Sequence, residues 1–441
     1  MQSELPPEKY TPRECEDMPV GIDIVKIDRI KKIGVQRLAD KILSDAEKPF
    51  FRPDKPESLA AAFAAKEAFS KALGTGMRGF DFRDISLLHD SLGKPYIVMS
   101  DKLSAIASSR GIGGCDVSLS HEKDYAAATV IIPSDSHFAR YKRAVQKLSA
   151  APDSVIKPDF IRSVLKPRRR DMHKGDCGRL FSIAGSLGLT GAAIMSADSA
   201  LRCGAGLVTL GCPKSLNTVF EVRLTEAMTL PLSDTDGIIN TADSEKILTR
   251  AQKSDCVLFG PGLGHNDGTE ELARILIKNC KSPIVADADG INSVCVNTDI
   301  LREHKSVILT PHIGEFARLC KREISDILSH TAEYAVSFAR EYGVVLVLKS
   351  HETAVASPDG TLMTNRLGNP GMATGGSGDV LSGAIASFVC QGFSLFDAAA
   401  AGVYVHSLAA DMAAQEKGEY GLLPTDIISY LPYAVKYSIG S

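Results

Sequence analysis

A glycine-rich turn that opens a buried helix is the feature that most constrains the fold of this chain. Residues 369–383 read Asn-Pro-Gly-Met-Ala-Thr-Gly-Gly-Ser-Gly-Asp-Val-Leu-Ser-Gly, and they run into an apolar stretch of small residues. Glycines before a helix direct several backbone N–H groups at one point, where the helix dipole favours an anion. An isolated pattern of this kind is usually a tight turn with Asp379 as a capping residue. With the Asn-Pro-Gly-Met-Ala-Thr lead-in, the string predicts a phosphoryl-transfer site.

The bulk properties exclude several classes of protein. At 441 residues the chain is too long for one ordinary domain, and we expect two or three. A net charge of −3 argues against general affinity for nucleic acid. No apolar run reaches the ~18 residues that span a bilayer, so we expect no membrane association. The ten cysteines form no Cys-x-x-Cys pair, which predicts buried free thiols in a reducing cytoplasm.

The chain divides into segments of different pattern. Residues 1–19 are rich in Pro and Glu and are predicted to be a disordered leader. Residues 20–132 mix strands and helices, which predicts an α+β domain. Residues 133–153 are predicted to be a linker, since Pro, Ser and Asp are frequent there. From residue 154 to 441, strands alternate with helices of small residues, which predicts an α/β domain with a mostly parallel sheet.

Apolar runs locate the individual elements. In the first domain we predict a strand over 20–27, a helix over 57–73 and a strand pair around 117–120 and 126–132. In the second domain we predict seven strands, at residues 180–184, 206–210, 256–259, 283–286, 306–309, 344–348 and 353–356.

Polar and glycine-rich strings follow several of these predicted strands. They are Ala184-Gly-Ser-Leu-Gly-Leu-Thr-Gly-Ala-Ala193, Phe259-Gly-Pro-Gly-Leu-Gly264, Ala286-Asp-Ala-Asp-Gly-Ile-Asn292 and Thr310-Pro-His-Ile-Gly-Glu315. A lone His or Asp at such a position is more often a cap or loop residue. Successive strand ends share one edge of a parallel sheet, where ligands of open α/β sheets bind. The set therefore predicts a ligand site along that edge.

These strings resemble the NAD(P)H-hydrate dehydratase family of the ribokinase-like fold over about residues 154–435. The resemblance rests on His173-Lys-Gly-Asp-x-Gly-Arg179, Thr190-Gly-Ala-Ala193, Gly204-Ala-Gly-Leu-Val208, Gly260-Pro-Gly-Leu-Gly264, Thr310-Pro-His-x-Gly-Glu315 and 369–383. It implies repair of hydrated NADH and NADPH. A hydroxyl of the hydrate is phosphorylated by ADP or ATP, AMP or ADP is released, and phosphate is then eliminated.

The same resemblance implies roles for particular residues. The hydrated dinucleotide is expected at Ala192, Gly264, His312 and Asp379, with Asp379 as the general base. The nucleotide is expected at Lys349, Ser350, His351, Glu352, Thr353 and Gly378. Two positions depart from the family pattern, since Ser350 stands where Gly is usual and Ile313 where Pro is common. The alternative is a small-molecule hydroxyl kinase of the same superfamily; the Thr310–Glu315 and Asn369–Thr374 strings favour dehydration. ADP is the better candidate for the donor.

The first domain carries a second set of charged residues. Asp23 lies within a predicted strand, where aspartate is uncommon. Glu67 and Lys71 lie four residues apart on the predicted helix, away from an apolar stripe. Taken alone, that pair is a solvated helix contact worth a few tenths of a kcal/mol. Two carboxylates on separate elements can also hold Mg²⁺, which keeps several waters and binds diphosphates.

The strings Gly21-Ile-Asp-Ile24, Ala64-Ala-Lys-Glu-Ala-Phe-Ser-Lys-Ala-Leu-Gly-Thr-Gly76, Asp90-Ser-Leu-Gly-Lys-Pro95 and Ser118-Leu-Ser-His-Glu-Lys-Asp-Tyr125 resemble holo-acyl-carrier-protein synthase. The resemblance implies transfer of 4′-phosphopantetheine from coenzyme A to a serine of apo acyl carrier protein. It places Mg²⁺ at Asp23 and Glu67, with Glu67 also catalytic. Coenzyme A is expected at Lys66, Lys71 and His121, and the carrier protein at Arg29.

One departure leaves an alternative open for this domain. Ala62 stands where the family usually has Arg, so one contact to coenzyme A is expected to be lost. The alternative is therefore a carrier-binding or oligomerisation module without catalysis. Transferases of this type commonly form trimers, and we expect a homo-oligomer. The sequence thus predicts a two-domain fusion enzyme.

Overall fold

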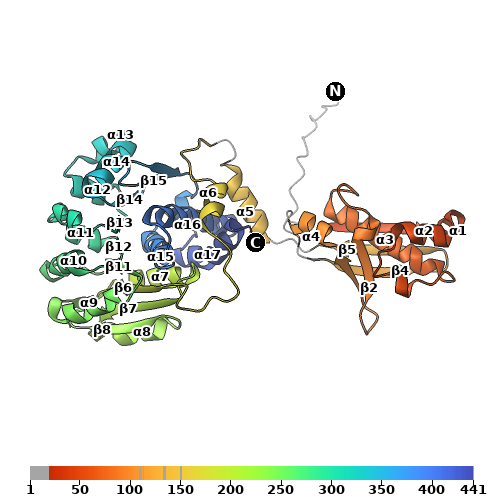
Figure 1. Ribbon diagram of the computed structural model, residues 1–441, viewed down its shortest axis with the longest axis horizontal. Coiled ribbons are helices and arrows are strands. Elements are labelled where there is room, and N and C mark those ends of the chain that lie inside the picture. The colour runs from red at the N-terminus through yellow and green to blue at the C-terminus, as the bar shows by residue number, and fades with distance from the viewer. Residues whose placement is uncertain (1–18, 109–111, 113, 133–135, 149–150, 441) are drawn as a thin grey trace, which may run out of the picture. The chain divides into compact units, whose positions relative to one another are not determined.

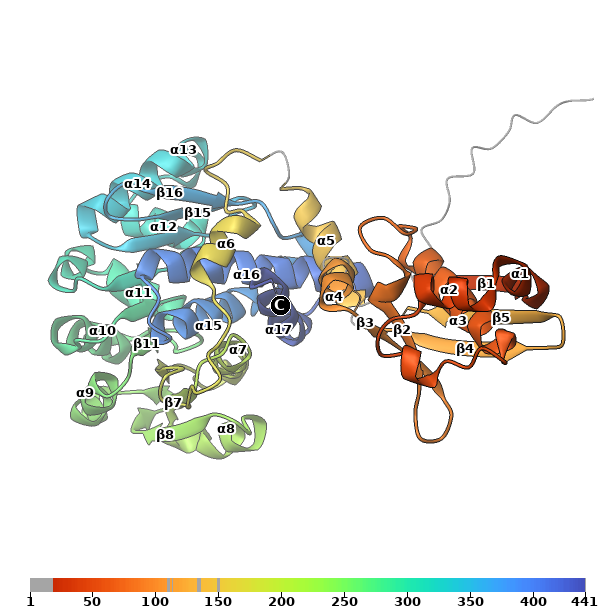
Figure 2. The ribbon, with the colours of Figure 1, turned by 45° about the vertical axis from the view of Figure 1, so that its right-hand side comes forward.

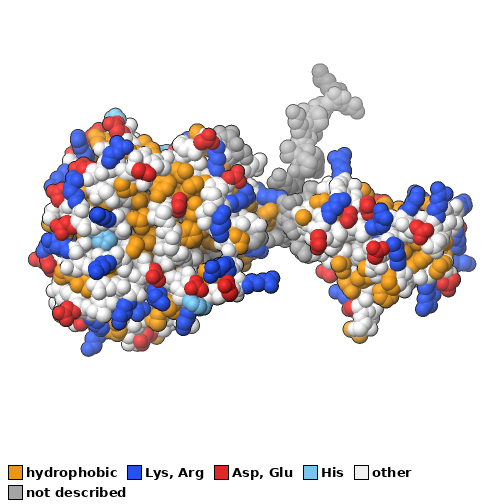
Figure 3. Space-filling view, viewed as in Figure 1, with side chains coloured by type: hydrophobic (Ala, Val, Ile, Leu, Met, Phe, Trp, Pro, Cys, Tyr) orange, Lys and Arg blue, Asp and Glu red, His pale blue; other side chains and the backbone are white. Residues whose placement is uncertain are grey.

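A computed structural model describes residues 19–108, 112, 114–132, 136–148 and 151–440. The chain divides into two compact units, residues 1–139 and 140–441. Most of the predicted leader, residues 1–18, lies outside the described residues, as does Cys15. None of the described helices is long and apolar enough to cross a membrane. Side chains of both charge signs are interspersed over the visible face of each unit (Figure 3).

The first unit is an α+β fold, as the sequence predicts. Its elements in chain order are β1 (Val20–Lys26), α1 (Ile27–Ile33), α2 (Val35–Ile42), α3 (Pro56–Leu73), β2 (Ile85–His89), β3 (Pro95–Met99), α4 (Asp101–Ser108), β4 (Asp116–His121) and β5 (Tyr125–Ile131). Strands β1, β5 and β4 form an antiparallel sheet, and β2 and β3 form a separate hairpin. The hairpin surrounds the 90–95 string but was not predicted as strands.

Helix α3 packs against β1 and β5 and supplies most of the core of the first unit. Most of its residues are buried. Many of these are alanines, whose small side chains let neighbouring elements approach the helix closely. Gly21 allows the close approach of β1 to this helix. A Cβ at Gly21 would lie 1.8 Å from the carbonyl oxygen of Ala68, so no other residue fits without moving the strand. Asp23 is thereby held beside the exposed edge of α3.

Helix α5 (Ser136–Gln146) runs across the division between the two units, within the segment predicted as a linker. The first strands and helices of the second unit are α6 (Pro158–Val164), β6 (Arg179–Ile183), α7 (Thr190–Arg202), β7 (Leu207–Pro213), α8 (Asn217–Arg223), β8 (Met228–Leu232), β9 (Asp234–Thr235), β10 (Ile238–Ile239), α9 (Ser244–Gln252), β11 (Cys256–Phe259) and α10 (Asp267–Asn279).

The remaining strands and helices complete the sheet and its covering layers. They are β12 (Ile284–Ala286), α11 (Asp289–Cys295), β13 (Val307–Leu309), α12 (Ile313–Cys320), α13 (Ile324–Ser329), α14 (Thr331–Tyr342), β14 (Val345–Leu348), β15 (Thr353–Ala356), β16 (Leu362–Asn365), α15 (Ser377–Cys390), α16 (Leu395–Lys417) and α17 (Pro424–Ser438). Two short 3₁₀ segments used below are η5 (Thr298–Glu303) and η6 (Pro370–Met372).

The second unit contains a nine-stranded sheet in the order β16-β15-β14-β13-β12-β11-β6-β7-β8. Its strands from β8 to β14 are parallel, and β15 and β16 are antiparallel additions at one edge. Helices α9 to α12 and α14 cover one face, and α7, α15 and α16 cover the other (Figure 1). All seven predicted strands are present; β8 and β16, at the two edges, were not predicted. The mostly parallel α/β sheet is confirmed.

The strand order reverses between β6 and β11. From β6 the chain adds β7 and β8 on one side, and it then returns to add β11 to β14 on the other. Ligands of open parallel sheets bind at the carboxyl ends of the strands beside such a reversal. The predicted strand-end strings after β6, β11, β12 and β13 all lie at this edge, as does the loop after β14.

The cysteines agree in part with the prediction of buried free thiols. All nine in the described residues are free. Six of them are buried, and Cys115, Cys295 and Cys320 are partly exposed.

Candidate active sites

The glycine-rich turn forms the start of α15, as the sequence predicts. Gly376 caps the helix with φ +102°, a conformation that glycine adopts readily. A Cβ at Gly378 would lie 3.3 Å from Nζ of Lys349. The amides in the first turn of a helix have no partner within it, and they favour an anion. A lysine amine therefore lies against an anion-binding helix start.

A buried charge cluster holds that lysine in place. Nζ of Lys349 donates to Oδ1 of Asp287 at 2.9 Å, and Oγ1 of Thr310 donates to the same oxygen at 2.7 Å. The Asp287 side chain is only 1% exposed. Burial alone would lower the pKa of Lys349, but Asp287, Glu315 and Asp379 outweigh it and raise that pKa. Lys349 is therefore a permanent cation at the carboxyl edge of the sheet.

Asp379 is the carboxylate in this cluster whose pKa is raised toward neutral pH. Burial raises its pKa to about 7, and the charge of Asp287 adds to the shift. Lys349 acts in the opposite direction and lowers the pKa of Asp379. A base that titrates near neutral pH can take a proton and later release it. The environment of Asp379 thus suits the predicted role of general base.

His312 and Glu315 are joined in a capping box at the start of α12. The Glu315 carboxylate accepts from the backbone N–H of His312 at 2.8 Å. Nδ1 of His312 accepts from the N–H groups of Gly314 and Glu315, which assigns the ring proton to Nε2. His312 and Lys349 form a parallel β-bridge, so the main chain places them next to each other. The half-exposed imidazole is therefore oriented by its own helix.

The predicted residues Ala192 and Gly264 lie around the loop that follows β11. A Cβ at Gly262 would lie 2.8 Å from Cβ of Ala192, so the first turn of α7 and the loop after β11 are direct neighbours. The N–H of Gly264 donates to Oδ2 of Asp289 at 2.9 Å. Asp289 follows Asp287 by two residues, and it therefore connects this loop to the charge cluster.

A cavity of about 890 Å³ opens beside Lys349. Among the predicted residues, its lining includes His312, Lys349, Ser350, His351, Thr353 and Gly378. Its other walls come from residues 367–374, α15 and α16. The volume falls within the range of small-molecule and cofactor sites. Ala192, Gly264 and Asp379 are absent from this lining, and the Glu352 carboxylate instead pairs with Arg366 at 3.0 Å.

Sequence reasoning missed His406, which lines the same cavity from α16. Burial lowers the pKa of His406 to about 4, and the charge of Lys349 adds to the shift. Oγ of Ser377 lies 3.5 Å from its Nε2. His406 is therefore neutral. No local signal marked it, because it is one polar residue in a helix of small apolar residues.

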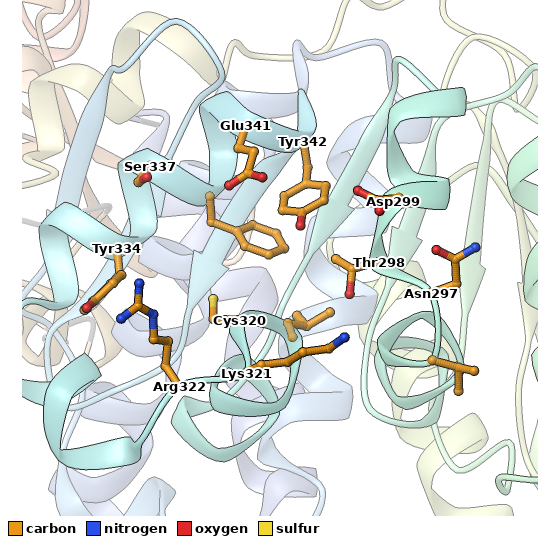
Figure 4. A pocket seen from close by; sticks show the side chains of 13 residues that line it. Asn297, Thr298, Asp299, Cys320, Lys321, Arg322, Tyr334, Ser337, Glu341 and Tyr342 are labelled. Carbon is orange, nitrogen blue, oxygen red and sulfur yellow. The ribbon is translucent and has the colours of Figure 1, made fainter.

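A second cavity of about 300 Å³ lies between η5 and helices α12 and α14, away from these strand ends (Figure 4). Arg302 spans two carboxylates beside this cavity, Asp299 at 3.4 Å and Glu341 at 3.0 Å. The Arg302 guanidinium also lies 4.7 Å above the Tyr342 ring. No residue predicted from the sequence lines this cavity. We therefore place the candidate site of the second unit at the larger cavity and the charge cluster.

In the first unit, the structure brings Asp23 and Lys71 together. Nζ of Lys71 donates to Oδ1 of Asp23 at 2.8 Å and to the carbonyl oxygen of Ile22 at 3.0 Å. Glu67, one turn earlier on α3, is partly exposed. No group of three or more His, Cys, Asp or Glu side chains in the described residues is arranged for a metal. Asp23 and Glu67 each carry a carboxylate, and hard oxygen ligands of this kind fit a cation that also keeps waters and substrate oxygens.

Lys66, which the resemblance places at coenzyme A, lies in the core of the first unit in this structure. Its side chain is fully buried, and Nζ donates to the carbonyl oxygens of Ile42 and Phe82 and to the Glu47 carboxylate. Burial lowers the pKa of Lys66, and Glu47 opposes the shift. Lys66 lies on a side of α3 that other parts of the first unit cover, so its side chain extends into the core. We therefore leave Lys66 out of the site.

The remaining predicted residues of the first unit are at the surface. Arg29 is exposed on α1, and His121 is exposed at the end of β4. Ala62, where the predicted family usually has Arg, is buried on α3.

Family comparisons cover both units. The family model for NAD(P)H-hydrate dehydratase matches residues 180–433, and the model for the 4′-phosphopantetheinyl transferase superfamily matches residues 19–130. The bifunctional NAD(P)H-hydrate repair enzyme Nnr of Moorella thermoacetica is 40% identical over 279 residues, which are 63% of this chain and 53% of that protein. This chain thus spans about half the length of the first curated relatives it matches.

Two further relatives are matched over most of their length. The ADP-dependent (S)-NAD(P)H-hydrate dehydratase of Neisseria meningitidis serogroup B is 36% identical over 60% of this chain and 87% of that protein. A crystal structure of ADP/ATP-dependent NAD(P)H-hydrate dehydratase from Bacillus subtilis, co-crystallized with ATP and Mg²⁺, has a TM-score of 0.55 and 26% identity. That match covers 64% of this chain and 98% of the other.

Proposed function

The chain belongs to the NAD(P)H-hydrate dehydratase family and carries a 4′-phosphopantetheinyl transferase domain before it, and we propose that it performs both reactions. The second unit would dehydrate (6S)-NADH and NADPH hydrates at the expense of ADP or ATP. The observation that carries this proposal is the Asp287–Lys349–Asp379 cluster at the glycine-rich start of α15, beside a cavity large enough for a nucleotide.

In the proposed mechanism, Asp379 takes the proton of the hydrate hydroxyl. The hydroxyl oxygen then attacks the terminal phosphorus of ADP or ATP, the bridging P–O bond breaks, and AMP or ADP leaves. The start of α15 and Lys349 stabilise the transferring phosphoryl charge. The C–O bond then breaks, phosphate leaves, and loss of the neighbouring C–H proton restores the double bond of the nicotinamide ring.

Binding positions follow the same layout. The nucleotide would occupy the cavity along Lys349, Ser350, His351, Thr353 and Gly378. The hydrated dinucleotide would lie near Ala192, Gly264 and His312, with its hydroxyl at Asp379. Glu352 holds the shape of this loop, because its carboxylate pairs with Arg366 and its carbonyl oxygen accepts from Oγ of Ser350 at 2.7 Å. ADP is the proposed donor, as in the ADP-dependent dehydratase of Neisseria meningitidis that this chain resembles.

A direct assay tests the dehydratase. NADH hydrate incubated with ADP, or separately with ATP, should give a rise in NADH absorbance together with AMP or ADP and phosphate. A stable phosphorylated hydrate without NADH would instead identify a hydroxyl kinase. No change with either nucleotide would refute the proposal for the second unit.

For the first unit we propose transfer of 4′-phosphopantetheine from coenzyme A to a serine of apo acyl carrier protein. Asp23 and Glu67 would hold Mg²⁺, which when bound would neutralise charge on the diphosphate. Lys71 lies next to Asp23 and would contact the same diphosphate, with His121 near coenzyme A. Arg29, exposed on α1, would contact the acidic carrier.

A mass measurement tests this second proposal. Apo carrier protein incubated with coenzyme A, Mg²⁺ and the full-length chain should gain the mass of phosphopantetheine. Glu67→Gln should lose most of the transfer, while Glu57→Gln, on the first turn of the same helix, should retain it. An unmodified carrier protein would favour a module without catalysis, the alternative that Ala62 suggests.

We also propose that the first unit forms a homo-oligomer through β1. Val20, Ile22 and Ile24 are exposed on the side of this strand that faces away from the core, where water would otherwise meet a row of branched apolar side chains. Light scattering on the full-length chain should therefore give more than one copy. A monomer over a wide concentration range would contradict this proposal.

A further inference from the structure

The segment before the matched dehydratase range contacts the wall of the nucleotide cavity. Helix α5 precedes residue 180, where the family match begins. From Arg140 onward it contacts the last turn of α16 (Figure 2), with Arg140 paired to Glu416 at 3.2 Å and its carbonyl oxygen accepting from Gln415. A segment predicted to be a linker is therefore docked on the second unit.

Just beyond α5, Lys147 meets a buried carboxylate. Nζ of Lys147 lies 2.7 Å from Oδ2 of Asp411, whose side chain is only 8% exposed. Asp411 in turn accepts from the N–H of Gly368 and from Nδ2 of Asn369, each at 3.0 Å. Nζ of Lys147 also donates to the carbonyl oxygen of Gly368 at 3.2 Å. Gly368 and Asn369 both line the large cavity.

Ser154 and Ile156 hold the chain at Thr364, just before the cavity wall begins at Leu367. Thr364, in the edge strand β16, donates its N–H to the carbonyl oxygen of Ser154 at 2.9 Å. Its carbonyl oxygen accepts from the N–H of Ile156 at 2.9 Å. Lys147 therefore attaches to the chain at residue 368, and Ser154 and Ile156 attach to it at residue 364, just before the cavity wall.

We propose that Lys147 is a positioning residue for the nucleotide, which rests on the proposed nucleotide-dependent dehydration. Its cation balances the charge of the buried Asp411 carboxylate, and that carboxylate holds Gly368 and Asn369 in the shape that receives the nucleotide. Without Lys147, the Asp411 carboxylate is buried without a cation, and it turns toward water. That movement weakens its two hydrogen bonds and loosens the wall.

The variant Lys147→Met in the full-length chain tests the role of the charge. Calorimetric titration with ADP should give a dissociation constant about tenfold higher than wild type, as expected for the loss of about 1.4 kcal/mol. The KM for ADP should rise by about the same factor, with kcat within about twofold, because no group at the reacting atoms changes. Lys147→Arg should restore most of the affinity, since the cation is kept.

Arg140→Met is the matched control. It removes an ion pair between the same helix and α16, and neither Arg140 nor its partner Glu416 lines the cavity. Nucleotide affinity should therefore stay within about twofold of wild type. Equal losses of affinity in both variants, or an unchanged affinity in Lys147→Met, would overturn the positioning role. A wild-type chain that binds neither ADP nor ATP would instead overturn the proposed function.

Discussion

The second unit keeps its charged groups in a buried cluster, whereas the first unit places its predicted metal ligand against a lysine that water reaches. Asp287 and Lys349 are enclosed at a sheet edge, and burial raises the pKa of Asp379 to about 7. Lys71, in contrast, is 52% exposed where it meets Asp23. The comparison indicates that the second site is preorganised by the fold. Under the proposed function, the first would be completed by the bound cation and diphosphate.

The largest expected effect is the loss of the buried base. Asp379→Asn keeps the shape of the side chain but cannot accept a proton. We expect kcat for dehydration to fall by about 10³-fold or more, within the usual range for a general base. NADH absorbance measures the rate. Asp397→Asn, on the exposed first turn of α16, is the control and should leave the rate unchanged. A variant at position 379 that retains a tenth of the activity would refute its role as the base.

The first unit also contains a buried ion pair, and this pair serves stability rather than catalysis. Lys66→Met leaves the Glu47 carboxylate buried with only the N–H groups of Ser44 and Leu87 as donors. We expect the loss of about 3–5 kcal/mol of unfolding free energy in the first unit. Thermal unfolding followed by circular dichroism measures it. Adding Glu47→Gln should recover part of the loss, because the unpaired charge is then gone. A stable Lys66→Met chain that fails to bind coenzyme A would revive the predicted ligand contact.

Sequence patterns identified the elements with strong apolar signals. The seven predicted strands of the second unit lie between the two edge strands of the sheet. They are buried apolar runs, so their composition alone predicts strands. Strand β8 contains Pro231, and β16 reads Leu-Met-Thr-Asn with partial exposure. Edge strands bury less surface, so their sequences are less constrained.

The surroundings of Lys66, His406 and Lys147 were not predicted from the sequence, for one common reason. Lys66 follows Ala65, which lies on the apolar stripe of the helix. Its burial is stabilised by the Glu47 carboxylate, 19 residues earlier in the chain. His406 and Lys147 acquire their surroundings from α15 and from Asp411, which are distant in sequence. Residues that meet a ligand at a strand end could be predicted, because parallel strands share an edge. Partners across the core could not, because no local pattern encodes them.

The pH dependence of dehydration tests the electrostatics of the second site. Asp379 must be deprotonated to act as a base, so kcat/KM should rise with pH and level off above its pKa of about 7. Lys349 lowers the pKa of Asp379, so Lys349→Met should move this rise to higher pH. Lys349→Arg keeps the charge and should leave the midpoint in place. Rates measured between about pH 5.5 and pH 8.5 would locate it. A midpoint that does not move in Lys349→Met would mean that another group sets the profile.

The smallest effect on stability is expected at the exposed Lys71–Asp23 pair, in contrast to the buried Lys66–Glu47 pair. Lys71→Met removes a contact to Asp23 that water already screens, so we expect a loss below about 1 kcal/mol. Lys102 is a matched control, because it is 62% exposed and pairs with Asp84, whose exposure of 18% equals that of Asp23. Lys102→Met should cost as little stability and leave transfer intact. Lys71→Met should raise the KM for coenzyme A, because the cation beside the proposed diphosphate position is lost. Equal KM values in the two variants would place the diphosphate elsewhere. A large loss of stability in Lys71→Met alone would show that the two sites are built alike.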